Sequence, residues 1–286
     1  MSVCLVNWNT RDLLAKCLET LAEYPPNCSY EVLVVDNASA DGSASLVADR
    51  FPEARLFPND ANLGYAAGNN QALGAARGEL LLLLNPDIEI LPEALVKLVD
   101  FMDAHPRAGA CAPQLVNLDG SPQSSFRRFP TPSAVLAGLL ESAGFHVKRP
   151  YKFFVMPEAG PVQVEQPMAS ATLLRRVALD EVGLFDEGFP LFFNDVDLCL
   201  RLVQAGWEIW AVPASQLIHH GGASTRQVRI EALRASHRSL LRFYRKHYYG
   251  SVPALAYWSV VAAAHLGGGL RILLARLSNW RTGNAR

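Results

Sequence analysis

The sequence predicts an α/β protein with an open, mostly parallel β-sheet and helices on both faces of the sheet. Two observations lead to this prediction. Short apolar segments alternate along the chain with segments whose apolar residues recur at helical spacing, an order typical of parallel sheets. Residues 80–84 are five consecutive leucines, as expected for a central strand that is buried on both faces. With 286 residues, half of them hydrophobic, the chain can bury a substantial core.

The expected elements follow one another in a regular order. Strands are expected at residues 3–7, 30–35, 54–58, 79–84, 109–115, 169–174 and 209–212. Helices are expected at residues 11–21, 43–51, 66–76, 92–105, 176–182 and 195–204, the first with Thr10 as its N-cap. Residues 117–165 are rich in proline and show no periodicity, so we expect loops and short helices that form a lid or an acceptor contact.

Polar residues stand at or just after the ends of three predicted strands: Asn7 and Asn9, then Asp36, then Asp87. Pro86 ends the leucine strand, because proline has no N–H to donate to a neighbouring strand. Ligands of open α/β sheets bind beyond the carboxyl ends of the strands. The chain has neither a GxGxxG motif after the first strand nor a GxxxxGK[ST] motif, so dinucleotide and P-loop sites are excluded. A different ligand site is therefore expected at this edge.

Each candidate residue also has a purely structural interpretation. Asp36 could accept a hydrogen bond from a nucleobase imide N–H, or it could form an Asx turn. Asp87 could ligate Mg²⁺ or Mn²⁺ on a diphosphate, or cap the next helix. His219 could be a ligand or a packed histidine. Asp195 and Asp197 could each be a general base or a favourable charge in the first turn of a helix. The residues alone leave these alternatives open.

Charge is distributed unevenly along the chain, although the net charge is only −1. Residues 1–220 contain 15 Lys and Arg against 26 Asp and Glu, whereas residues 221–286 contain 11 against 1. A basic tail suits an anionic surface, either phospholipid or nucleic acid. The tail also contains an uncharged, mostly apolar stretch at residues 250–270, which a bilayer needs and nucleic acid does not. We therefore expect a helix that lies in the membrane interface and no nucleic-acid partner; a core-packing or homodimer-forming helix is the alternative.

The five cysteines are scattered, with no C-x-x-C pair and no histidine at ligand spacing. This pattern argues against a zinc site and a disulfide framework, and favours a reducing compartment. The first predicted strand begins at residue 3, which leaves no room for a signal sequence, so a cytoplasmic location is expected.

Six motifs occur in order between residues 3 and 225: VNWNTRDLLAKCLETL, VVDNASADGS, NLGYAAGNN, LLLLNPD, FFNDVDLCLRLVQAGW and LIHHGGAS. Together they resemble the family 2 glycosyltransferases, especially the bacterial rhamnosyltransferase-like branch. The resemblance implies a GT-A fold with a Rossmann-like sheet over residues 1–225. Residues 1–115 would form its nucleotide-sugar-binding half and residues 116–225 its acceptor and catalytic half. Residues 226–286 would form a basic, apolar helical tail associated with the membrane.

The resemblance further implies an inverting transfer of a sugar from a nucleotide diphosphate, with Asp195 as the catalytic base. Asp87 and His219, with His220 as the fallback, would hold Mg²⁺ or Mn²⁺. The residues implied around the donor are Asn7, Asn9, Arg11, Asp36, Asn37, Asp41, Asn69 and Asn85.

The favoured donor is dTDP-rhamnose, with a UDP- or GDP-sugar as the alternative. The favoured acceptor is a cell-envelope glycan or a polyprenyl-diphosphate-linked glycan at the inner face of the cell membrane. Asn85 and Asn194 stand where the fullest family pattern has carboxylates, and this departure motivates a second alternative, a sugar-nucleotide-binding scaffold without catalysis.

Overall fold

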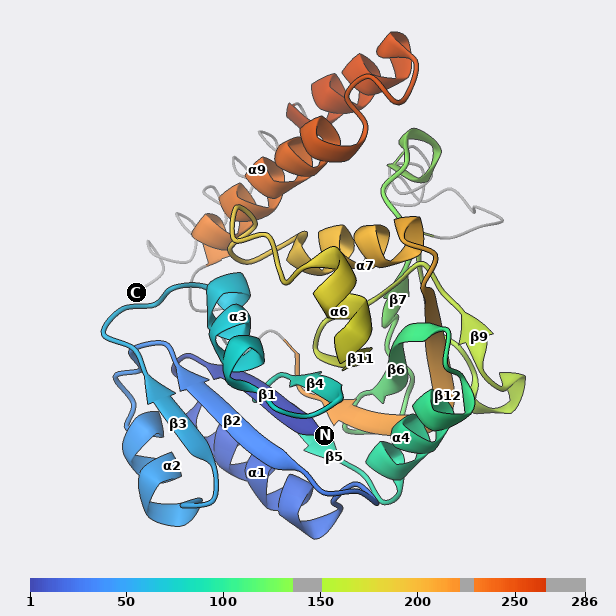
Figure 1. Cartoon of the computed structure of the whole chain (residues 1–286). Helices are drawn as coiled ribbons and strands as arrows, with labels where there is room; N and C mark the ends of the chain where they lie inside the picture. The colour runs from blue at the N-terminus through green and yellow to red at the C-terminus, as the bar shows by residue number, and fades with distance from the viewer. Residues whose placement is uncertain (136–150, 222–228, 266–286) are drawn as a thin grey trace.

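The computed structural model describes residues 1–135, 151–221 and 229–265. A central sheet lies between two layers of helices (Figure 1). The strand order in this sheet is β3-β2-β1-β4-β11-β6-β12-β5, with β9 paired to β12. These strands are β1 (Ser2–Asn7), β2 (Glu31–Asp36), β3 (Arg55–Pro58), β4 (Leu80–Leu84), β5 (Ile88–Ile90), β6 (Ala108–Val116), β9 (Val162–Gln163), β11 (Ala171–Arg175) and β12 (Glu208–His219).

The α/β class is confirmed, and the sheet is mixed in direction. Strands β3, β2, β1 and β4 are parallel to one another, as the alternation of strands and helices predicts. Strand β11 runs antiparallel to both β4 and β6, between which it lies. An apolar strand that is buried on both faces has no sequence pattern that reports its direction, so this reversal could not be predicted.

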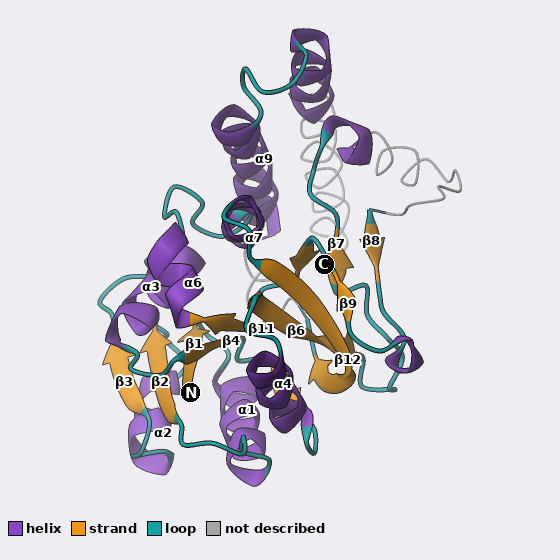
Figure 2. Ribbon diagram, turned by 45° about the vertical axis from the view of Figure 1, so that its right-hand side comes forward, coloured by secondary structure: helices purple, strands orange, loops and turns teal. Residues whose placement is uncertain are grey.

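Helices cover both faces of the sheet, as expected (Figure 2). One core cluster contains apolar residues of α1 (Arg11–Glu23), α2 (Ser43–Arg50) and α4 (Ala94–Ala104). The other contains apolar residues of α3 (Tyr65–Ala75), α6 (Arg176–Val182) and α7 (Asn194–Gln204). The alternation of side chains along β1 explains the division, because Val3 and Leu5 belong to the first cluster and Cys4 to the second.

Several local predictions need correction. Thr10 precedes α1, but its hydroxyl makes no capping bond and instead donates to Asn7 Oδ1 at 2.6 Å. The expected strand at residues 209–212 continues to His219, through an irregularity between Val212 and Gln216. Strand β5 was not expected, because its three residues are too few to show a period.

The segment expected as loops contains short strands in its described part. A second, three-stranded antiparallel sheet has the order β10 (Gln166–Pro167), β7 (Phe126–Arg127) and β8 (Lys152–Phe153). The 3₁₀ helix η1 (Pro157–Ala159) follows β8. Residues 136–150 of this segment lie outside the described part of the chain.

Helix α9 (Arg229–His247) lies across the outside of α7, and a further helix follows at residues 254–265 (Figure 1). Phe243 and Tyr244 of α9 are buried, and the Tyr244 hydroxyl donates to the Pro130 carbonyl at 2.5 Å. Among the helices of the described residues, none is both long enough and apolar enough to cross a membrane. Residues 266–270 of the predicted apolar stretch lie outside the described part.

All five cysteines are free thiols. Burial raises the pKa of Cys4 to about 12 and also raises the pKa of Cys17, Cys111 and Cys199. Cys28 alone among the five is partly exposed.

Candidate active site

The carboxyl ends of three parallel strands meet at one edge of the sheet. In the register of β1, Asn7 lies beside Asp36 of β2, and Leu5 lies beside Leu84 of β4. Strands β2 and β4 are both neighbours of β1, so Asp36 and the loop after β4 are separated by two strand spacings, roughly 10 Å. The expected convergence of these strand ends is therefore present.

Asp36 is almost fully buried and is held by two hydrogen bonds. Asn7 Nδ2 donates to Asp36 Oδ1 at 2.8 Å, and the Ser39 N–H donates to Asp36 Oδ2 at 3.0 Å. The second bond closes a turn, so the structural interpretation of Asp36 is observed. Each carboxylate oxygen has two lone pairs, so Asp36 can still accept a hydrogen bond from a ligand.

Two loops at this edge are fastened together by Asn9 and Asp41. Asn9 adopts a left-handed backbone conformation, with φ of 52°, and its Oδ1 accepts a hydrogen bond from the Ala40 N–H at 2.8 Å. Asp41 Oδ2 accepts from the Arg11 N–H at 2.9 Å, which gives α1 the cap that Thr10 was expected to provide. Burial acts to raise the pKa of Asp41, but hydrogen bonds from Ser43 and Arg11 outweigh it and lower the pKa.

Asn37 and Asn69 are buried beside the start of α3. Asn37 Nδ2 donates to the Gly64 carbonyl at 3.2 Å, and Asn69 Nδ2 donates to the Tyr65 carbonyl at 2.9 Å. Gly68 lets α3 approach β1, because a Cβ atom at this position would lie 2.8 Å from Val6 Cγ1. The bond of Asn37 thus fixes the start of α3 at the edge of the sheet, whereas the bond of Asn69 lies within α3.

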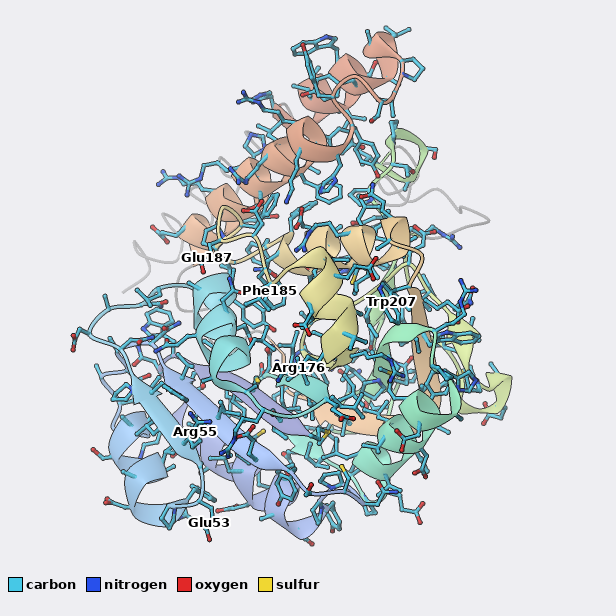
Figure 3. The ribbon with its side chains drawn as sticks, in the orientation of Figure 1. Glu53, Arg55, Arg176, Phe185, Glu187 and Trp207 are labelled. Carbon is cyan, nitrogen blue, oxygen red and sulfur yellow. The ribbon has the colours of Figure 1, made fainter. Side chains whose placement is uncertain are left out.

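Helix α3 is also bound from its other side, by the loop that follows α6. The ring of Phe185, labelled in Figure 3, lies 6.1 Å from that of Tyr65. The Phe185 N–H donates to Asn70 Oδ1 at 3.0 Å, and the N–H of Tyr65 donates to the Pro190 carbonyl at 2.8 Å. The loop between α6 and α7 is therefore attached to α3.

The loop after β4 brings Asp87 to the end of β12. The Asn85 N–H donates to the Ser170 carbonyl at 2.8 Å, and the His220 N–H donates to the Asp87 carbonyl at 3.0 Å. Asp87 is buried, and its Oδ1 lies 3.6 Å from His219 Nε2. His220 is paired elsewhere, with Glu89 at 2.6 Å, so His219 is the histidine that faces Asp87.

Gln123, which the sequence analysis did not identify, determines which nitrogen of His219 carries the proton. Gln123 Nε2 donates to Asn117 Oδ1 at 2.8 Å and to the His219 carbonyl at 2.7 Å, which fixes the orientation of the amide. Gln123 Oε1 lies 2.9 Å from His219 Nδ1 and can only accept. In the neutral ring, His219 Nδ1 is therefore the protonated nitrogen, and Nε2, which faces Asp87, carries the lone pair.

The pair of Asp87 and His219 fits a divalent cation. Burial lowers the pKa of His219 more than the charge of Asp87 raises it, which favours the neutral ring that can ligate a metal. A histidine whose other ring nitrogen is held by an amide is a common arrangement for a metal ligand. Among the described residues, no group of three or more His, Cys, Asp or Glu could hold a metal. The remaining ligands would be oxygens of the substrate and water.

Asp195 lies in the first turn of α7, where burial raises its pKa. The positive charge of Arg127 and hydrogen bonds from the Val196 N–H at 2.9 Å and Gln166 Nε2 at 3.0 Å oppose this shift only in part. Gln166 is fully buried in β10 and was not identified from the sequence. A carboxylate with a raised pKa is suited to proton transfer near neutral pH.

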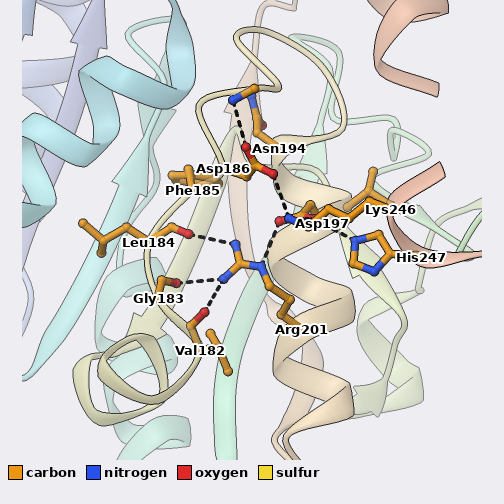
Figure 4. Close-up of polar contacts among 12 residues, drawn as sticks. Val182, Gly183, Leu184, Phe185, Asp186, Asn194, Asp197, Arg201, Lys246 and His247 are labelled. Atoms are coloured by element: carbon orange, nitrogen blue, oxygen red, sulfur yellow. Dashed lines mark hydrogen bonds and ion pairs between the residues drawn. The ribbon is translucent and has the colours of Figure 1, made fainter. Parts of the chain in front are cut away.

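Asp197, two residues further along α7, has the opposite environment (Figure 4). It is fully buried, and its carboxylate contacts Arg201 Nε at 2.8 Å, Lys246 Nζ at 2.6 Å and His247 Nε2 at 2.7 Å. Burial acts to raise the pKa of Asp197, but these three contacts outweigh it and lower the pKa to about 2. A carboxylate that is paired with Arg201 and Lys246 and contacted by His247 is a poor base, which leaves Asp195 as the carboxylate suited to accept a proton.

Tyr65 links the surroundings of Asp195 to those of Asp87. Its hydroxyl donates to the Ala169 carbonyl at 2.8 Å. The carbonyl of the next residue, Ser170, accepts the Asn85 N–H. Burial raises the pKa of Tyr65, the negative charge of Asp195 raises it further, and Asp87 makes a smaller contribution of the same sign. Both carboxylates therefore lie close enough to act on one phenol.

Asn194 stands where the fullest family pattern has a carboxylate, and its amide side chain has a structural role. Its Oδ1 accepts from the Asp195 N–H at 2.7 Å, and its Nδ2 donates to the Phe189 carbonyl at 3.1 Å. An ionised glutamate could accept the first bond but could not donate the second. The amide thus fixes the start of α7 without a second negative charge beside Asp195.

A mixed α/β sheet with a buried carboxylate and histidine at its strand ends, and a second carboxylate of raised pKa at the start of α7, is the arrangement expected of a glycosyltransferase of the GT-A class. The chain belongs to glycosyltransferase family 2, because the sequence model described as "Glycosyl transferase family 2" matches residues 2–183.

Two relatives extend this result. The chain is 33% identical over 245 residues to the N-acetylglucosaminyl-diphospho-decaprenol L-rhamnosyltransferase of Mycobacterium tuberculosis, a match that covers 80% of this chain and 79% of that protein. It is 30% identical over 229 residues to the O-antigen biosynthesis protein RfbC of Myxococcus xanthus, which covers 75% of this chain and 17% of that protein. The resemblance to a bacterial rhamnosyltransferase is therefore confirmed over 80% of the chain.

Two solved structures share the fold. The mannosyltransferase PcManGT of Pyrobaculum calidifontis, in complex with GDP-Man and Mn²⁺, superposes with a TM-score of 0.59 at 19% identity, over 100% of this chain and 75% of that chain. GalNAc-T7 with UDP, GalNAc and Mn²⁺ superposes with a TM-score of 0.61 at 17% identity, over 85% of this chain and 47% of that chain. At these identities the likeness concerns the fold alone, and it confirms the predicted GT-A class.

Proposed function

We propose that this glycosyltransferase transfers L-rhamnose from dTDP-rhamnose, with inversion, to a hydroxyl of a lipid-linked or cell-envelope glycan. The observation that carries the proposal is that the charges of Asp195 and of Asp87, the partner of His219, both act on the buried phenol of Tyr65. The choice of sugar and acceptor is supported by the mycobacterial relative, whose name specifies rhamnosyl transfer to a diphospho-decaprenol-linked N-acetylglucosamine.

In this proposal, Asp195 takes the proton from the acceptor hydroxyl as that hydroxyl attacks the sugar. Gln166 holds Asp195 in place through the 3.0 Å bond to its Oδ2. Gln166 Oε1 is buried and has no hydrogen-bond partner among the described residues, so it can accept a bond from the incoming acceptor. The raised pKa of Asp195 is the physical reason to assign the base role to it rather than to Asp197.

On the donor side, Asp87 and His219 would hold Mg²⁺ or Mn²⁺. When bound, the cation neutralises the charge that develops on the departing nucleoside diphosphate. Asp36 would accept from the nucleobase imide, and Asn85 would lie beside the diphosphate. The residues that surround the nucleotide, directly or by shaping the two loops, would be Asn7, Asn9, Arg11, Asn37, Asp41 and Asn69.

The end of the described tail supports a peripheral position at the inner face of the cell membrane. Tyr249, Leu255 and Trp258 have 70%, 81% and 59% of their surface exposed. Aromatic side chains with a polar atom are favoured at the interface of a bilayer, and basic residues of the same tail suit anionic lipid.

The membrane proposal is tested by sedimentation with vesicles of phosphatidylglycerol and phosphatidylcholine. Replacing Leu255 and Trp258 together by serine should weaken binding at least about tenfold, because each buried apolar side chain contributes about 1.5–3 kcal/mol. Val177 is 58% exposed on α6 and provides the control, since Val177→Ser should leave binding unchanged. Equal sedimentation of wild type and the double variant would contradict the proposal.

The transfer reaction is tested by mass spectrometry of products from a panel of dTDP-, UDP- and GDP-sugars with a bacterial lipid extract as acceptor. The expected product carries one deoxyhexose and forms with dTDP-rhamnose. A hexose product from another donor would correct the sugar, whereas nucleotide binding without turnover of any donor would support the scaffold alternative.

A further inference from the structure

Helix α9 belongs to the tail that we expect at the membrane from the sequence, yet one of its faces is directed at α7, the helix that contains Asp195. This face, which we call the docking face, consists of Arg242, Phe243, Lys246 and His247. These residues follow the i, i+1, i+4, i+5 spacing of one helix side. Each of them contacts the segment that runs from Asp186 to Asp197.

The polar half of the docking face joins two buried or half-buried carboxylates (Figure 4). Lys246 Nζ lies 2.8 Å from Asp186 Oδ2 and 2.6 Å from Asp197 Oδ1, so a single ammonium group bridges the loop and α7. Arg242 Nη2 lies 3.1 Å from Asp186 Oδ1, and His247 Nε2 lies 2.7 Å from Asp197 Oδ1. Two of the three side chains that contact the Asp197 carboxylate therefore come from α9.

The aromatic half of the docking face supports a strained residue. Phe193, directly before α7, has a φ of 68°, a strained conformation for a bulky side chain that persists only where the surrounding structure enforces it. The ring of Phe193 packs against the buried ring of Phe243, with centroids 5.6 Å apart. The carbonyl of Phe193 accepts the Asp197 N–H at 2.9 Å, so its conformation sets how α7 begins.

The loop of residues 186–193, which precedes α7, packs against α9. The guanidinium of Arg242 lies 5.1 Å from the centre of the Phe189 ring. A Cβ atom at Gly188 would lie 2.2 Å from Arg242 Cζ, so a larger residue here would displace the Arg242 guanidinium. Phe189 in turn accepts a hydrogen bond from Asn194, the residue that precedes Asp195.

We propose that the docking face of α9 is a positioning element of the active site, which holds Asp195 in place through Phe193 and Asp197. Arg242, Phe243, Lys246 and His247 are then positioning residues that act through α7 and touch no substrate. This inference rests on the proposed role of Asp195 as base, and it assigns the tail a part in the chemistry as well as at the membrane. Any event that moves α9 on the lipid surface would therefore change the position of the Asp195 carboxylate.

The test compares full-length wild type, His247→Ala, His247→Gln and Arg245→Ala in detergent micelles, where no bilayer contributes. Arg245 is an exposed cation of the same helical turn and is not part of the docking face. His247→Ala should speed backbone hydrogen exchange over residues 189–199 about tenfold and leave β1 and β4 protected. With dTDP-rhamnose and an N-acetylglucosaminyl-diphospho-lipid, kcat should fall about tenfold and the donor KM should stay within about twofold.

Two comparisons separate positioning from general stability. His247→Gln keeps a side-chain N–H for Asp197 and should recover part of the loss, and Arg245→Ala should match wild type in both measurements. Lys246→Met is measured in parallel, so that the test holds if His247→Ala fails to fold.

Unchanged exchange over residues 189–199 and unchanged kcat in the folded variants would overturn the inference, even if wild type transfers rhamnose. If wild type transfers no sugar, the proposed function fails, and hydrogen exchange still decides whether α9 holds the start of α7.

Discussion

Replacing Asp195 by asparagine is the most direct test of the proposed chemistry. Asp195 accepts two hydrogen bonds, one on each oxygen, from the Val196 N–H and from Gln166 Nε2. Asparagine has a single acceptor oxygen, so one of these bonds is lost at a cost of about 1 kcal/mol. This cost is small against a domain stability of about 5–15 kcal/mol, so the variant should fold.

The loss of the base has a larger effect than the loss of the hydrogen bond. Removal of a general base lowers turnover by about 10²-fold or more, which corresponds to about 2.7 kcal/mol in the activation barrier. Donor affinity should be kept, because the hydrogen bonds of Asp36 and the contacts of Asp87 do not involve Asp195. Product formation followed by mass spectrometry gives kcat, and calorimetry with dTDP gives nucleotide affinity. A kcat within about threefold of wild type, in a folded variant, would refute the assignment of the base.

Three further predictions concern the neighbours of the base and of the metal pair. Because the pKa of Asp195 is raised, the acid limb of kcat/KM against pH should lie above the usual range of an aspartate, and Gln166→Leu should move it higher by removing a bond that favours the ionised form. Gln123→Leu frees the ring of His219 and should weaken Mn²⁺ affinity about 10- to 100-fold, measured by paramagnetic resonance with dTDP present. Asp197→Asn removes the buried negative charge that Arg201 and Lys246 share, and it should lower the free energy of unfolding by about 3 kcal/mol at pH 7 in urea titrations. The pKa of Asp197 in the folded protein is about 2, below its ordinary value of 3.8. The stabilisation by its carboxylate is therefore present above about pH 4 and is lost as the pH falls through 2. Over this range, the difference in free energy of unfolding between wild type and Asp197→Asn should shrink.

Helices and strands whose apolar residues follow a clear pattern were predicted well from the sequence. Helix α6 has the predicted bounds, residues 176–182, and β4 differs from its prediction by one residue. The carboxyl ends of β1, β2 and β4 also meet where the βα alternation predicts. These features depend on local patterns, which a single sequence contains.

Features that depend on partners distant in the chain were not predictable. Gln123 and Gln166 stand in a segment without periodicity, and only folding brings them to His219 and Asp195. A cluster of basic residues in an amphipathic helix usually indicates a solvated face. In α9, however, Lys246 and His247 pair with a buried carboxylate, and no feature of the tail's own sequence reports that partner.

The distribution of thiols in the fold makes the native chain suitable for labelling. Alkylation needs the thiolate, and the raised pKa values of the four buried cysteines suppress that form at neutral pH. A maleimide dye should therefore attach at Cys28, without any substitution. Cys28 precedes β2, and the strand, which is roughly 16 Å long, ends at Asp36, so the two residues flank its opposite ends. A fluorophore there would report how the enzyme is oriented on a vesicle without obstructing its substrates.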